Sequence, residues 1–171
     1  MNDKKRVALT GFMGVGKSSV ARHLAHLLHC RRIDLDFYTE ECEGRKIAEI
    51  IDAEGIDRYR EIETLSLERL LIESHERILS LGGGTWTVGR NRELLKQHDF
   101  TTVWLESDFE HCWLNITHSR KDRPLARNKQ KALQLFNERQ KVYCLADWHF
   151  VIRKGYTSYD LARQIADSVF A

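Results

Sequence analysis

Proline and long apolar segments are scarce in this sequence. Pro124 is the single proline among 171 residues, so no proline-rich linker divides the chain. No apolar run approaches the roughly 20 residues needed to cross a bilayer, which argues against a membrane partner. The apolar segment near the N-terminus is too short and too soon interrupted for a signal peptide. We therefore expect a single cytoplasmic domain that covers residues 1–171.

An excess of charge of one sign is also lacking. The formal net charge is +2, which gives no reason to expect a nucleic-acid partner. The cysteines show no C-x-x-C spacing, and we expect four free thiols: Cys30, Cys42, Cys112 and Cys144. Three histidines that precede Cys30 would drift around a helix at their spacing, which does not suit a metal site. We expect a monomer.

Glycine, in contrast, is concentrated in one stretch, "TGFMGVGKSS" at 10–19. Its glycines, Lys17 and Ser18 satisfy the pattern G-x-x-x-x-G-K-[ST]. A short apolar strand precedes the stretch and a helical pattern follows it, which favours a phosphate-binding loop over an ordinary glycine-rich turn. Backbone N–H groups and the helix N-terminus would bind phosphates. Lys17 would contact the outer phosphates, and Ser18 would offer its hydroxyl to Mg²⁺.

Short apolar runs alternate with longer helical patterns along the whole chain. We expect strands at 6–10, 32–35, 77–81, 101–106 and 148–153. We expect helices at 17–28, 37–54 in pieces, 57–74, 90–98, 108–117, 129–145 and 158–169. This alternation predicts an α/β fold with a parallel sheet and helices on both faces. Ligands of such sheets bind at the carboxyl ends of the strands.

Two of these strand ends contain residues suited to chemistry. Asp34 and Asp36 are two residues apart, so on an extended backbone they would point the same way and suit Mg²⁺ binding and hydroxyl activation. The alternative is an acidic junction in which Asp36 caps the next helix. Three glycines, 82–84, follow the third strand. They predict either a close approach of the backbone to a ligand or a plain loop.

Basic residues gather in two further places. Arg60 and Glu63 are three residues apart on a predicted helix and could simply pair with each other. The segment 118–129 is basic and irregular, which is typical of a mobile lid over phosphates or of a solvated loop. Arg139 follows on the next helix, where an exposed surface arginine is the simpler interpretation.

Taken in order, several segments resemble the shikimate kinase family, small-molecule kinases of the nucleoside-monophosphate-kinase-like P-loop class. They are "GFMGVGKSS", "IDLDFYTE", "YREIE", "LSLGGGT", "VWLE", "RPLA" and "ERQKVY". The resemblance covers nearly the whole chain and implies a three-layer P-loop kinase fold with a five-stranded parallel sheet in the order 2-3-1-4-5. It also implies a substrate-binding helical segment at about 36–62 and a lid at about 118–129. Tyr59, usually Phe, and Ala126, usually Leu, depart from the pattern.

The resemblance implies a reaction in which ATP phosphorylates the 3-hydroxyl of shikimate, a step toward aromatic amino acids. The residues it implies for ATP are Gly14, Val15, Gly16, Lys17, Ser18, Ser19 and Arg123. Those it implies for shikimate are Asp36, Arg60, Gly83 and Arg139. Mg²⁺ would be held by Ser18 and, through water, by Asp34. The catalytic residues would be Lys17, Asp36 and Arg123, with Asp36 acting on the hydroxyl and the two cations stabilising the phosphoryl group.

Two other functions stay open from the sequence alone. One is a related P-loop kinase that acts on another small hydroxy acid, because two arginines indicate a carboxylate but not a particular ring. The other is a non-catalytic nucleotide-binding module derived from a kinase. Loss of Lys17, Asp36 or Arg123 would mark such a module, and all three residues are present.

Overall fold

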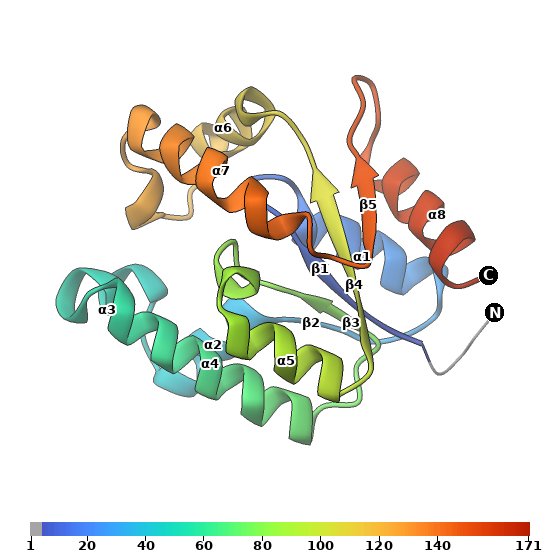
Figure 1. Cartoon of the computed structure of the whole chain (residues 1–171), viewed down its shortest axis with the longest axis horizontal. Helices are drawn as coiled ribbons and strands as arrows, with labels where there is room; N and C mark the ends of the chain where they lie inside the picture. Colours follow the sequence, from blue (N-terminus) through green and yellow to red (C-terminus); the bar gives the residue numbers. More distant parts are fainter. Residues whose placement is uncertain (1–4) are drawn as a thin grey trace.

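The computed structural model describes residues 5–171 and contains one parallel sheet. Its strands are β1 (Arg6–Thr10), β2 (Arg32–Asp34), β3 (Ile78–Ser80), β4 (Phe100–Glu106) and β5 (Trp148–Val151). They lie in the order β2-β3-β1-β4-β5, and every neighbouring pair is parallel (Figure 1). The predicted fold class and strand order are therefore confirmed.

Helices connect these strands and cover both faces of the sheet. The first four are α1 (Lys17–Leu27), α2 (Leu35–Glu43), α3 (Ile47–Glu54) and α4 (Ile56–Glu73). The last four are α5 (Gly89–Gln97), α6 (Phe109–His118), α7 (Lys129–Tyr143) and α8 (Ser158–Val169). Two short 3₁₀ turns that the sequence did not predict are η1 (Thr85–Thr87) and η2 (Pro124–Ala126).

The central strands are apolar because both of their faces are covered. Val7, Ala8 and Leu9 of β1 have no exposed surface, and neither has Ile78 of β3. Helices α1 and α8 pack against each other on one side of the sheet, while α4, α5 and α7 lie on the other side (Figure 1). A continuous apolar run is what a parallel strand buried between two helical layers requires.

The junction after β2 differs from the sequence expectation. The strand ends at Asp34 and α2 begins at Leu35, so Asp36 lies in the first turn of a helix and not on an extended strand. Asp34, not Asp36, caps the helix, because its Oδ1 accepts hydrogen bonds from the N–H groups of Asp36 (3.1 Å) and Phe37 (3.3 Å). Leu35 is fully buried, which explains why the chain turns inward at this point.

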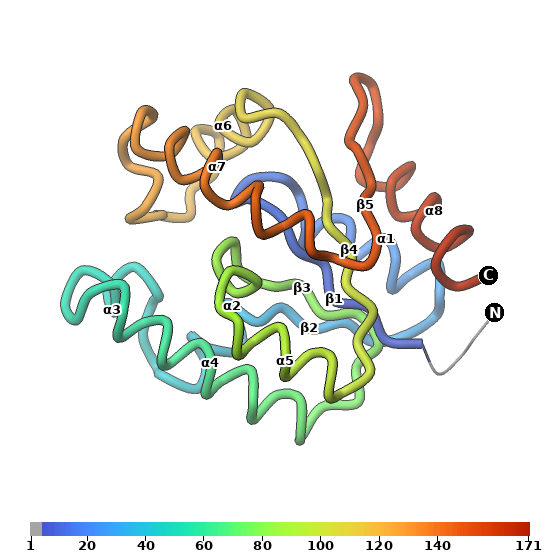
Figure 2. The backbone as a smooth tube through the Cα atoms, viewed as in Figure 1, coloured from blue at the N-terminus to red at the C-terminus, as the bar shows by residue number. Residues whose placement is uncertain are grey.

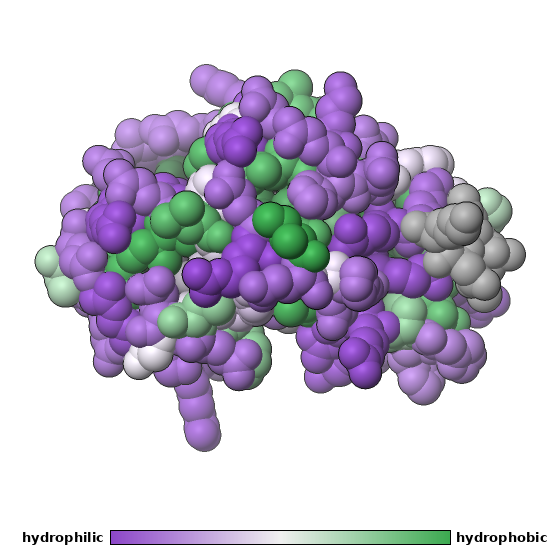
Figure 3. All heavy atoms as spheres, turned by 90° about the horizontal axis from the view of Figure 1, so that it is seen from below, coloured by the Kyte–Doolittle hydropathy of each residue, from purple (hydrophilic) through white to green (hydrophobic). Residues whose placement is uncertain are grey.

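Several segments of the chain lie beyond the carboxyl ends of the strands. Helix α3 and the segment between α6 and α7 both extend beyond this end of the sheet (Figure 2). The face seen in Figure 3 is mostly hydrophilic, with apolar side chains in small separated patches. Within residues 5–171, no helix is both long and apolar enough to cross a membrane.

The burial pattern of α4 gives a test of the fold. Leu70 is fully buried in the core, whereas Leu65 on the same helix is 60% exposed. We expect Leu70→Ala to lower the free energy of unfolding by about 2–5 kcal/mol, because it removes apolar contacts and leaves a cavity. The matched control Leu65→Ala should change it by about 0.5 kcal/mol or less. Urea unfolding measures both, and equal effects would contradict the position of α4.

Candidate active site

The glycine-rich loop lies between β1 and α1, as the sequence predicted. Gly14 has a φ of +78°, and a Cβ built on it would lie 2.5 Å from the carbonyl oxygen of Cys112 on α6. The carbonyl oxygen of Gly14 also accepts a hydrogen bond of 2.7 Å from Nδ2 of Asn115, on the same helix. Helix α6 therefore packs directly against this loop and fixes its backbone. Gly16 caps α1, which begins at Lys17.

Lys17 is folded back into the loop. Its Nζ donates hydrogen bonds to the carbonyl oxygens of Gly11 (2.7 Å) and Phe12 (3.0 Å). Burial lowers the pKa of Lys17 to about 8, although the nearby carboxylate of Asp36 opposes this shift. A bound anion beside this amine would raise the pKa of Lys17 toward its usual value.

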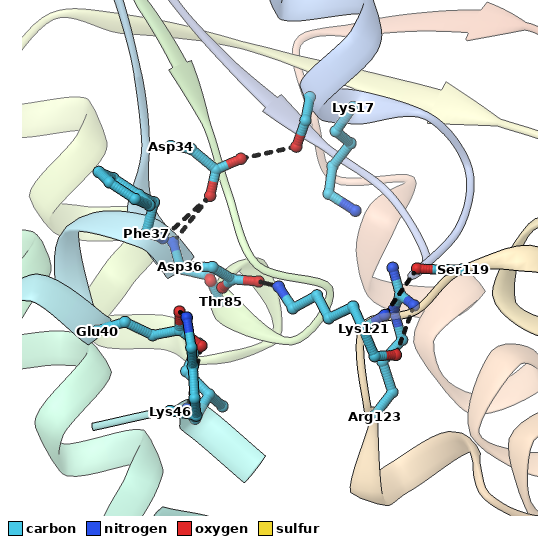
Figure 4. A network of polar contacts seen from close by, with 12 residues as sticks. Lys17, Asp34, Asp36, Phe37, Glu40, Lys46, Thr85, Ser119, Lys121 and Arg123 are labelled. Atoms are coloured by element: carbon cyan, nitrogen blue, oxygen red, sulfur yellow. Dashed lines mark hydrogen bonds and ion pairs between the residues drawn. The ribbon is translucent and has the colours of Figure 1, made fainter.

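Ser18 and Asp34 meet at the start of α1. The Ser18 hydroxyl donates a 2.7 Å hydrogen bond to Oδ2 of Asp34 (Figure 4). Hydroxyl and carboxylate oxygens are ligands that suit Mg²⁺, usually together with phosphate oxygens and water. Within residues 5–171 no group of three His, Cys, Asp or Glu residues forms a complete metal site. The hydroxyl of Ser18 and the carboxylate of Asp34 thus provide two oxygen ligands of the kind that Mg²⁺ takes.

The three glycines after β3 pack tightly against functional side chains. A Cβ built on Gly82 would lie 2.7 Å from Oδ1 of Asp36 and 2.9 Å from Oε2 of Glu63. A Cβ on Gly84 would overlap the guanidinium of Arg60. The absence of side chains at these positions lets α2, α4 and the loop converge, and the approach of the loop backbone to a ligand stays a prediction.

Glu63 is a fully buried carboxylate with three hydrogen-bond donors. It accepts from Nη1 of Arg60 (2.7 Å), from the hydroxyl of Thr85 (2.8 Å) and from the phenol of Tyr59 (3.2 Å). Burial alone would lower the pKa of Arg60, but the ion pair with Glu63 outweighs it and leaves that pKa raised. The predicted pairing of Arg60 with Glu63 is confirmed, and Arg60 also lines the main cavity.

Arg139 lies in a different electrostatic environment. Its side chain is buried on α7, with 7% of the residue exposed, so the interpretation as a surface arginine is wrong. No carboxylate within residues 5–171 forms an ion pair with it, and burial, with a smaller contribution from Arg60, lowers its pKa although Tyr143 and the charge of Glu63 oppose the shift. Its neighbour Tyr143 donates a hydrogen bond to the carbonyl of Gly83. The site thus contains a desolvated cation without an acidic partner.

These residues surround one cavity of about 1240 Å³. Its lining includes Asp34, Asp36, Arg60, Glu63, Gly83, Arg123 and Arg139, so the predicted acceptor residues come together. The cavity meets the glycine-rich loop at Met13, and Figure 4 shows Lys17 and Asp36 on facing sides of the same region. A volume of this size is at the upper end of small-molecule sites.

The predicted lid closes one side of this cavity. Arg123 does not reach the loop; its Nη1 donates a 3.2 Å hydrogen bond to the carbonyl of Lys121. The sequence indicated little that would anchor the segment, but Ala126 is buried and Arg127 binds both carboxylate oxygens of Asp52 on α3, at 2.9 and 2.7 Å. The lid therefore contacts the helical segment opposite. Its mobility stays a prediction.

Sequence reasoning missed three positioning residues of this site. Asn115 holds the glycine-rich loop, Tyr143 holds the triple-glycine loop, and Thr85 completes the shell of Glu63. Each acts across a distance of 20 or more residues along the chain, so no local pattern predicts its partner. Only Glu63 had a local signal, its spacing from Arg60.

This chain is similar to known proteins of one family. A family model described as shikimate kinase matches residues 13–170. A shikimate kinase of Persephonella marina is 33% identical over 161 residues, covering 94% of this chain and 96% of that protein. One of Rhodococcus jostii is 40% identical over 141 residues, covering 81% and 82%.

A solved structure gives the same result. The shikimate kinase of Acinetobacter baumannii, solved in complex with shikimate, matches with a TM-score of 0.89 at 32% identity, covering 98% of this chain and 94% of that one. The sequence and structural matches extend over almost the whole molecule and include the loops described above. The chain belongs to the shikimate kinase family.

Proposed function

We propose that this protein transfers the γ-phosphoryl group of ATP to the 3-hydroxyl of shikimate. The observation that supports this most strongly is Arg139, a buried cation without a carboxylate partner in the cavity that also contains Arg60 and Asp36. Desolvating such a charge is costly unless a ligand compensates it. A small acid with a neighbouring hydroxyl group provides both the missing anion and the group to be phosphorylated.

Recognition of the acceptor follows from these side chains. Arg60 and Arg139 bind the shikimate carboxylate, since a planar guanidinium forms parallel hydrogen bonds with two oxygens. The backbone N–H of Gly83 binds the ring substituents. Asp36 accepts a hydrogen bond from the 3-hydroxyl and so directs its oxygen toward the donor.

The donor side uses the glycine-rich loop. The N–H groups from Gly14 to Ser19 and the N-terminus of α1 bind the phosphates, with Lys17 on the β- and γ-phosphates. Arg123 moves from its contact with Lys121 onto the phosphates. Ser18 and, by way of water, Asp34 would hold Mg²⁺, which would supply positive charge beside the phosphates.

Phosphoryl transfer itself then requires little covalent help from the protein. The hydroxyl oxygen attacks the γ-phosphorus in line, its proton passes to Asp36, and ADP leaves with the bridging oxygen. Lys17 and Arg123 stabilise the charge that develops on the transferred group. The products are ADP and shikimate 3-phosphate.

The proposal also includes the domain organisation of the chain. Residues 1–171 form a single kinase domain, in which the helical segment at about 36–62 binds the acceptor and the segment at about 118–129 serves as the lid. That the enzyme is monomeric and cytoplasmic and has no nucleic-acid partner stays a prediction from the sequence.

A turnover assay with MgATP tests the proposal against its two alternatives. We expect ADP release with shikimate and much less with hydroxy acids of other ring shape, or with a shikimate analogue that lacks the carboxylate. Preference for another hydroxy acid would favour a related kinase. Binding of ATP without turnover of any hydroxy acid would indicate a non-catalytic module.

Substitution of Asp36 tests its assignment as the base. Asp36→Asn keeps the size of the side chain but cannot take the hydroxyl proton, so we expect kcat to fall by about 10²–10⁴. The control Asp57→Asn changes an exposed acid on α4 of the same helical segment and should leave kcat unchanged. An unchanged kcat/KM for shikimate in Asp36→Asn would remove Asp36 from the site.

The lowered pKa of Lys17 predicts how nucleotide binding depends on pH. The pKa of free Lys17 is about 8, and bound phosphates raise it, so the complex keeps a proton that the free enzyme loses as the pH rises above 8. Affinity is therefore complete at lower pH and decreases at higher pH. The Kd of a non-hydrolysable ATP analogue should rise about tenfold from about pH 7 to about pH 9.

A matched variant isolates this effect from other titrating groups. The substitution Lys17→Arg changes Lys17 alone and leaves its charged and titratable neighbours Asp34, Asp36, Cys112 and Lys121 in place. Lys17→Arg keeps its charge throughout this range, so its Kd should vary much less with pH. Calorimetry measures both proteins, and parallel pH profiles would contradict the assignment.

A further inference from the structure

One lysine of the lid reaches across the cavity to the proposed base. Nζ of Lys121 lies 2.7 Å from Oδ2 of Asp36, although the two residues are 85 positions apart in the sequence. Figure 4 shows the Lys121 side chain extended from the lid toward α2. The contact joins the lid directly to the Asp36 carboxylate, the group that is proposed to accept the hydroxyl proton.

The same ammonium group lies close to the donor side. The negative charge of Asp36 raises the pKa of Lys17, and the positive charge of Lys121 lowers it. Two amines and the carboxylate of Asp36 therefore converge between the glycine-rich loop and the acceptor residues, and the carboxylate of Asp34 also acts on Lys17. This is the region through which a phosphoryl group passes on its way from ATP to a hydroxyl near Asp36.

The lid backbone holds Lys121 in this direction. Its N–H donates to Oγ of Ser119 at 3.2 Å, and its carbonyl accepts from Nη1 of Arg123 at 3.2 Å. The lid is in turn attached to α3 by the bidentate pair of Arg127 with Asp52. Arg123, the lid residue implied by resemblance, here supports the turn from which Lys121 extends.

We propose that Lys121 is a catalytic cation of the lid that contacts the transferring phosphoryl group. This inference rests on the proposed kinase function. In the free enzyme Lys121 pairs with Asp36. The acceptor hydroxyl takes its place on the carboxylate, and the ammonium moves onto the γ-phosphate oxygens nearby.

The role assigned to Lys121 does not change which bonds form and break in phosphoryl transfer. The hydroxyl oxygen forms the new bond to phosphorus, the bond between phosphorus and the bridging oxygen breaks, and the proton goes to Asp36. Lys121 donates hydrogen bonds and neither gains nor loses a proton. It compensates charge on the phosphoryl oxygens, which is the requirement of this class of reaction.

An ordinary surface ion pair is the competing explanation. Such pairs contribute little, and the 44% exposure of the Lys121 side chain would suit one. The other paired lid cations bind no proposed reacting group: Lys129 binds Glu110 at 2.9 Å outside the cavity, and Arg127 binds Asp52 and Asp122, of which Asp122 lines the cavity. Lys121 differs from them because its partner is a proposed reacting group.

Kinetics of Lys121→Met and of the control Lys129→Met distinguish the two explanations. Lys129→Met removes a lysine of the same segment whose partner lies outside the cavity. We expect Lys121→Met to lower kcat about 10²–10³-fold, as for loss of one donor to a transition state. Its KM for shikimate should change by about threefold or less, and Lys121→Arg should restore part of kcat. Lys129→Met should keep the wild-type kcat.

A binding measurement separates this inference from the proposed function. MgADP with fluoroaluminate mimics the transferring phosphoryl group, and its affinity is measurable without turnover of any acceptor. Lys121→Met should lose affinity for this mimic far more than for MgADP alone, since the proposed contact is made to the phosphoryl group. Equal loss for both ligands, or a kcat of Lys121→Met close to that of wild type, would overturn the assignment of Lys121.

Discussion

The acceptor site depends on the buried carboxylate of Glu63. This single group binds Arg60 of its own helix and the hydroxyl of Thr85 after the triple-glycine loop, so it fixes α4 against that loop. It forms an ion pair with Arg60, whereas the buried Arg139, which also lines the cavity, forms no ion pair within residues 5–171 and is influenced by Glu63 only as a lesser electrostatic contribution. Arg139 is therefore a buried cation that a bound anion would stabilise. A ligand with one carboxylate is what such a site requires.

The charged groups on the donor side are arranged differently from those of the acceptor site. Lys17 donates hydrogen bonds to backbone carbonyls and Lys121 pairs with Asp36, so without ligand both amines are influenced by the carboxylate of Asp36, and Lys17 also by that of Asp34. Phosphates reverse this situation, because they supply negative charge and leave Asp36 available to a hydroxyl. Binding of the donor and release of the proposed base are thus linked by the same set of charges. Rigid packing around the triple-glycine loop keeps these groups in position.

Much of this arrangement was predictable from the sequence because its signals are local. The glycine-rich loop, the strand order implied by resemblance and the pairing of Arg60 with Glu63 depend on short patterns and are confirmed. The prediction that Asp34 and Asp36 lie on one extended strand was wrong, because a helix begins at the buried Leu35. The contacts of Lys121 and Tyr143 were unpredictable, since their partners Asp36 and Gly83 lie 85 and 60 positions away.

A crystal structure with shikimate bound tests the central claim most directly, that Arg139, a buried arginine without an ion pair in the described part of the chain, defines the acceptor site. The account predicts that the shikimate carboxylate binds Arg139 and Arg60 and that the 3-hydroxyl lies within hydrogen-bond distance of Asp36. It further predicts that Glu63 keeps its bond to Arg60, because the ligand compensates Arg139 and does not replace Glu63. A carboxylate bound away from Arg139, or a 3-hydroxyl directed away from Asp36, would contradict the account.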